Sequence, residues 1–139
     1  MRAGPFITDS RIPMRPGVAL LSLTLLLSGA AIAAEVEIDT DFMQTVEDTN
    51  KSLSNNIASH DANASRADAS ELQAMFAKVE TFYATKGDAA DAVELSRKSQ
   101  HLAEQVSKLV AAKDFDAASG TATDLSRTCK ACHNFYKKS

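Results

Sequence analysis

The sequence predicts an all-α protein that forms an antiparallel, up-down-up-down four-helix bundle. Gly and Pro, which interrupt helices, are scarce at 5 and 3 residues. Apolar residues recur at spacings of three and four positions, and no alternating strand pattern occurs. The length of 139 residues suits one domain. The net charge of −3, without a basic stripe or an aromatic platform, argues against nucleic-acid binding.

The N-terminal segment 1–34 has the features of a signal peptide. An arginine precedes a nearly continuous apolar run over 18–27, and small residues at 31–33 fit a cleavage site. The apolar run is shorter than the roughly 20 residues needed to cross a bilayer, so no membrane span is expected in the mature chain. Met14 is a candidate initiator, because a chain that begins there has a shorter basic segment, with Arg15, before the apolar run. The expected mature domain is 35–139.

The first predicted helix covers 39–59. Its inward face follows the three- and four-residue spacing of Met43, Val46, Asn50, Leu53 and Ile57. The stretch 60–69 is polar, small and unpatterned, so it is predicted to be the longest loop. The second helix begins near Ser70 and ends at Gly87, a residue type suited to the position after a helix. Its apolar face contains Leu72, Met75, Phe76, Val79, Phe82 and Tyr83.

The third helix is predicted to be capped by Asp88 and the fourth by Asp114, after a break over 111–113. The predicted apolar face of the third helix contains Ala92, Leu95, Leu102, Val106, Leu109 and Val110. Short connections place each helix beside its neighbour in sequence and reverse its direction. The start of the first helix and the end of the fourth then lie at the same end of the bundle. The pocket expected there is lined by Phe42, Met43, Val46, Val79, Phe82 and Tyr83, and covered at its edge by Tyr136.

The clearest chemical signal is the run Cys129-Lys130-Ala131-Cys132-His133. C-x-x-C-H is the signature of c-type haem attachment. On a helix, positions i, i+3 and i+4 share one face, so two thiols and an imidazole there can meet one flat ring. The sequence therefore predicts one covalent haem c, bound through Cys129 and Cys132, with His133 as the proximal iron ligand.

Other interpretations of the two cysteines are weaker. A redox C-x-x-C needs a thioredoxin-like βαβ context, which the helical pattern does not supply. A disulfide between them closes a very small loop and contributes little stability. A zinc site needs further ligands, and the remaining histidines, His60 and His101, lie along their helices far from the motif. A further alternative is that the chain is a helical module without haem, in which the two cysteines have no chemical role.

The helical pattern with the C-terminal run 129–137, CKACHNFYK, resembles the class II c-type cytochromes, which are cytochrome c′ and its low-spin relatives. The stretch 112–118 before the last helix is also similar to members of this family. The resemblance implies haem c, a periplasmic location and no enzymatic turnover. It also implies redox partner proteins and leaves open a homodimer through the first two helices.

Within the family, the sixth iron ligand separates two functions. Low-spin members carry a Met near the start of the first helix and transfer electrons. Met43 is the matching residue here, so the resemblance implies a His/Met-ligated one-electron carrier. The alternative is a five-coordinate cytochrome c′ that binds nitric oxide or carbon monoxide, with Met43 filling the core. The first helix lacks the Arg that many members carry, which leaves the haem propionates without a matched partner.

Overall fold

The computed structural model describes residues 37–136, and regular structure within this range is entirely helical. The four helices are α1 (Thr40–Ala58), α2 (Ala62–Lys86), α3 (Ala90–Ala111) and α4 (Phe115–Tyr136). The predicted all-α class and the four helices are thus confirmed. The signal peptide predicted for 1–34 lies outside the described residues. Among the helices described, none combines the length and the apolar character that crossing a membrane requires.

Aspartate side chains cap the starts of three helices. Asp39 accepts a hydrogen bond from the Phe42 backbone N–H at 2.7 Å. Asp61 and Asp114 accept equivalent bonds at 3.0 and 3.1 Å, and Asp114 was the predicted cap of α4. Each bond satisfies a backbone donor that the first turn of a helix leaves unpaired.

The predicted cap at Asp88 is wrong. The residue at the N-cap of α3 is Ala89, and no side chain caps this helix. Ala89 and Ala92 are 5% and 0% exposed. The first turn of α3 is thus packed against the bundle through two small buried residues and has no side-chain cap.

The predicted loop over 60–69 is also wrong, because α2 begins at Ala62. Alanines within this stretch have the highest helix propensity, and Asp61 supplies the cap. Ser65 and Ala69 are both fully buried. The small side chains at these positions let α2 pack closely against its neighbours. Because the stretch 60–69 contains no large apolar residue, its sequence resembles that of a loop.

Each helix packs against its neighbours in sequence, and α1 also packs against α4. Side-chain hydrogen bonds between different helices support these contacts. On one side of the bundle, Asn56 of α1 donates to Asp68 of α2 at 2.8 Å, and Gln100 of α3 donates to Glu80 of α2 at 2.7 Å. The residues of α4 that form hydrogen bonds to α1 and α3 line the cavity described below.

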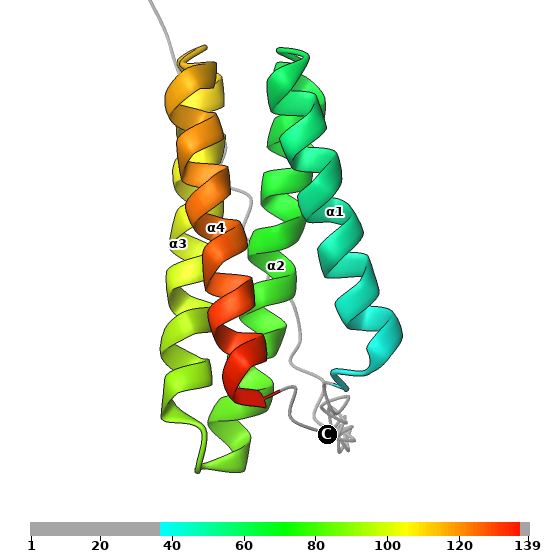
Figure 1. Ribbon diagram of the computed structural model, residues 1–139, viewed down its shortest axis with the longest axis vertical. Coiled ribbons are helices and arrows are strands. Elements are labelled where there is room, and N and C mark those ends of the chain that lie inside the picture. The colour runs from blue at the N-terminus through cyan, green and yellow to red at the C-terminus, as the bar shows by residue number, and fades with distance from the viewer. Residues whose placement is uncertain (1–36, 137–139) are drawn as a thin grey trace, which may run out of the picture. The chain divides into compact units, whose positions relative to one another are not determined.

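Figure 1 shows the course of the chain: the colour sequence runs upward in α1, downward in α2, upward in α3 and downward in α4. The start of α1 and the end of α4 therefore lie at the same end. Of the four helix contacts, that between α1 and α4 is the least extensive. In Figure 1 the first half of α1 leans away from the other helices toward this end.

The buried face of α3 is narrower than predicted. Its buried residues are mostly small: Ala92, Ser96, Ser99, Ala103, Val106 and Val110. Leu95, Leu102 and Leu109, which were expected on this face, are only half-buried. Small residues on α3 bring its backbone close to the bundle interior while leaving space beside Ser96 and Ser99.

Gly120 offers a direct test of the α4 helix. It lies on an exposed face, and a Cβ there would meet no atom within 4 Å. Since Gly costs about 1 kcal/mol relative to Ala inside a helix, Gly120→Ala should stabilise the fold by about that amount. For a domain of this size the melting temperature should rise by roughly 4–8 °C, measured by far-UV circular dichroism.

Gly87 provides the matched control. It also faces open space, but its φ of +77° is a left-handed conformation. An L side chain there costs roughly 1–2 kcal/mol, so Gly87→Ala should lower the melting temperature. A Gly120→Ala variant that melts no higher than wild type would contradict the helix propensity argument.

Candidate functional site

All four helices contribute to a cavity of about 410 Å³. Its walls are drawn from the first half of α1, the middle of α2, the second and third turns of α3, and the second half of α4. The lining residues are Met43, Val46, Glu47, Asn50, Lys51, Phe76, Val79, Leu95, Ser96, Ser99, Ser126, Thr128, Cys129, Lys130, Cys132 and His133. Its volume falls in the usual range for small-molecule and cofactor sites, roughly 300–1,000 Å³.

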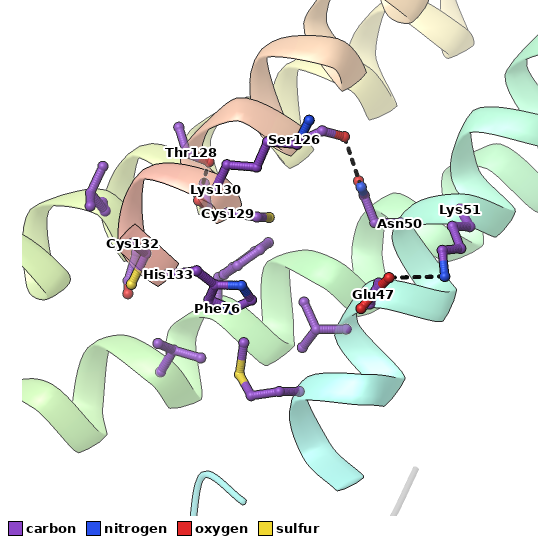
Figure 2. Close-up of a pocket in the computed structure, with 16 residues that line it drawn as sticks. Glu47, Asn50, Lys51, Phe76, Ser126, Thr128, Cys129, Lys130, Cys132 and His133 are labelled. Atoms are coloured by element: carbon purple, nitrogen blue, oxygen red, sulfur yellow. Dashed lines mark hydrogen bonds and ion pairs between the residues drawn. The ribbon is translucent and has the colours of Figure 1, made fainter. Parts of the chain in front are cut away.

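The C-x-x-C-H motif lies in α4, as the helical spacing predicts, and all three reactive side chains line this cavity. Cys129, Cys132 and His133 are each half-buried, and both cysteines are free thiols. Figure 2 shows Cys129 and His133 directed from α4 toward the space in front of α1. One helix therefore presents two thiols and an imidazole to the same enclosed space.

Burial affects the chemistry of both thiols. It raises the pKa of Cys129 to about 11, with smaller contributions from Cys132 and Glu47, and it also raises the pKa of Cys132. At neutral pH both thiols are therefore protonated. Redox-active C-x-x-C motifs have the opposite property, because their nucleophilic cysteine has a lowered pKa. The two thiols of this cavity therefore lack the activated thiolate of a redox-active pair.

Met43 faces the motif from α1. It lines both the first cavity and a second one of about 500 Å³, which opens toward the start of α1. Val79, Cys132 and His133 also line both cavities, as does Glu47. The two cavities thus adjoin along the Met43 and His133 side chains, and these two potential iron ligands border the same space.

The structure brings only some of the predicted pocket residues together. Val46 and Val79 line the first cavity and Tyr83 lines the second. Phe42 instead packs against the hydrophobic core, and the Phe82 ring packs edge-on against Tyr83 with centroids 5.2 Å apart. Neither phenylalanine lines either of these two cavities. Tyr136 ends α4, but its side chain lies outside the described residues.

Polar residues for which the sequence predicted no functional role form part of the cavity wall. Asn50 Nδ2 donates to Ser126 Oγ at 2.8 Å, which joins α1 to α4 (Figure 2). Ser99 Oγ and Thr128 Oγ1 lie 2.7 Å apart and join α3 to α4. Two features of the sequence could have indicated these residues. Ser126 and Thr128 come just before the motif in the same helix, and Asn50 interrupts the apolar face of the first helix.

Charged side chains lie at the rim of the cavity. Glu47 and Lys51 of α1 form an ion pair at 2.9 Å, and Lys130 of α4 is exposed. Lys86, the last residue of α2, places its Nζ 4.5 Å from the centroid of the Phe82 ring and lines neither cavity. Lys51 and Lys130 are thus the lysines that line the cavity.

The other histidines lie elsewhere. His60 occupies the turn after α1 and stacks on Phe115 with ring centroids 4.5 Å apart, and His101 is exposed on α3. Neither lines a cavity. Over residues 37–136, no three His, Cys, Asp or Glu side chains gather closely enough to hold a metal ion by themselves. A porphyrin differs from such a site, because it supplies four iron ligands and needs only axial groups from the protein.

The site fits a covalently bound haem on three structural grounds. Its volume is suitable, its walls are largely apolar, and thiol, imidazole and thioether groups all border it. No protein-family model, curated protein or solved structure matches this chain.

Proposed function

We propose that the protein is a monohaem c-type cytochrome of the periplasm that carries single electrons. The observation that carries this proposal is the presence of Cys129, Cys132, His133 and Met43 around one cavity. When bound, haem supplies reversible one-electron chemistry between Fe(II) and Fe(III). The chain would then be an antiparallel four-helix bundle built around one covalent haem, as the resemblance to class II cytochromes implies.

Each side chain has a distinct role in this proposal. Cys129 and Cys132 would hold the haem, each through a thioether formed by addition of its S–H across one vinyl group. His133 would supply an imidazole ligand to the iron, and Met43 would supply a thioether ligand. Val46, Phe76 and Val79 supply apolar walls that exclude water.

His/Met ligation supports electron transfer for two reasons. A thioether is a soft, neutral ligand, so it favours ferrous iron and raises the reduction potential. A thioether from Met43 would also leave no iron position open to solvent, which would limit structural change between the two oxidation states. Redox partner proteins are expected, since a carrier of this kind exchanges electrons with a donor and an acceptor. The export signal predicted for 1–34 supports the periplasm as the place where this occurs.

Haem extraction tests this function directly. The full chain should be expressed in a host that exports and matures c-type cytochromes. After acid–acetone treatment, we expect the haem to remain with the polypeptide, and the pyridine haemochrome spectrum to show two saturated vinyl groups. Haem that extracts freely into acetone, or a purified chain without haem, would refute the proposal.

A further inference from the structure

Asn50 presents an unusual feature at the inner end of the cavity. Its Oδ1 atom is buried and has no hydrogen-bond partner among the described residues, although its Nδ2 donates to Ser126. An unpaired buried acceptor costs roughly 1–3 kcal/mol. Turning the amide over exchanges the two atoms and leaves the other one unpaired. The arrangement therefore calls for a hydrogen-bond partner from outside the protein chain.

The neighbouring hydroxyl groups do not supply that partner. Ser126 Oγ donates its hydrogen to the Ala122 carbonyl at 3.2 Å. Thr128 Oγ1 donates to the Leu125 carbonyl at 2.7 Å, so Ser99 is the donor in the bond between Ser99 and Thr128. All three hydroxyl hydrogens are thus engaged. The oxygen atoms of these hydroxyl groups can accept further hydrogen bonds, but they have no hydrogen to offer Asn50 Oδ1.

We propose that Asn50 is a positioning residue that holds one ordered water at the inner end of the cavity and lowers the reduction potential of the iron. This rests on the proposed function. The haem macrocycle has no donor group to offer Asn50, whereas a water occupies about 30 Å³ and can donate. If its second hydrogen goes to a hydroxyl oxygen of the wall such as Ser126 Oγ, a water that donates to Oδ1 turns its own oxygen toward the haem-binding space. That negative end favours the more positive ferric state.

The test compares Asn50→Leu with Asn56→Leu. Asn56 lies on the same helix and is also half-buried, but it bonds to Ser52 and Asp68 and lines neither cavity. Spectroelectrochemistry at a fixed applied potential should give Asn50→Leu a ferrous-to-ferric ratio about three- to tenfold above wild type, where tenfold equals about 59 mV for one electron. Asn56→Leu should match wild type.

A crystal structure of the wild-type chain provides a readout that does not depend on haem. We expect an ordered water within hydrogen-bond distance of the Asn50 amide, and its loss in Asn50→Leu. A dry amide in the wild type overturns the inference, as does an unchanged potential in a haem-loaded Asn50→Leu protein. A chain without haem refutes the proposed function, and the water is then still decided by the crystal structure.

Discussion

Replacing both motif cysteines, as Cys129→Ala with Cys132→Ala, is expected to abolish covalent haem completely. Without thiols no thioether can form, so any haem that enters the cavity is held by its axial ligands and apolar contacts alone. Acid–acetone should then remove all of the haem, and the mass of the polypeptide should equal that of the bare chain. Each single replacement should leave one thioether and a haemochrome spectrum with one unsaturated vinyl group.

Histidine variants serve as controls for this experiment. His60→Ala and His101→Ala remove imidazoles that line neither cavity, so both variants should retain covalent haem. His133→Ala should keep the thioethers but lose the proximal ligand, which changes the spectrum and weakens haem incorporation. Retention of haem after acid–acetone in the double cysteine variant would show that the thiols are incidental.

Met43→Leu is expected to convert the iron from a low-spin to a high-spin state. Leu has nearly the volume of Met, and such exchanges usually cost less than about 1.5 kcal/mol, so the bundle should remain folded. It lacks the thioether, however, and therefore leaves the sixth coordination position open. The absorption spectrum should become that of high-spin iron, the reduction potential should fall, and carbon monoxide should bind without displacing a protein ligand.

Met75→Leu is the matched control. Met75 is 6% exposed in the core of α2 and lines neither cavity, so its replacement should leave the spin state unchanged. A wild-type protein that is already high-spin and binds carbon monoxide freely would mean that Met43 only fills space. The gas-binding cytochrome c′ would then become the better description of the protein.

The elements that the sequence predicted correctly depend on local signals. The three- and four-residue apolar spacing is enough to reveal α1, and Gly87 marks the end of α2 through its left-handed φ of 77°. The errors fall where tertiary packing decides. At 60–69 the buried residues are Ser65 and Ala69, which carry no apolar pattern, so the first part of α2 resembled a loop.

The part of the candidate site that could be predicted from the sequence is the part whose reactive side chains lie in one short segment of α4. The motif's spacing placed Cys129, Cys132 and His133 on one helical face, and the structure gives all three access to one cavity. The role of Asn50 was not predictable, because its bond to Ser126 joins residues 76 positions apart. Only the packing of α1 on α4 brings such residues together.

The limited contact between α1 and α4 has a consequence for the order in which the molecule comes apart. Native proteins open in parts, and the parts with the fewest buried contacts open at the lowest free energy. Here α1 meets that condition, because its contacts with α2 and α4 are the two least extensive of the four main helix contacts, whereas the contact between α2 and α3 is the most extensive. Outward movement of α1 would uncover the cavity while α2, α3 and α4 stay packed against one another. A large planar group could enter by that route.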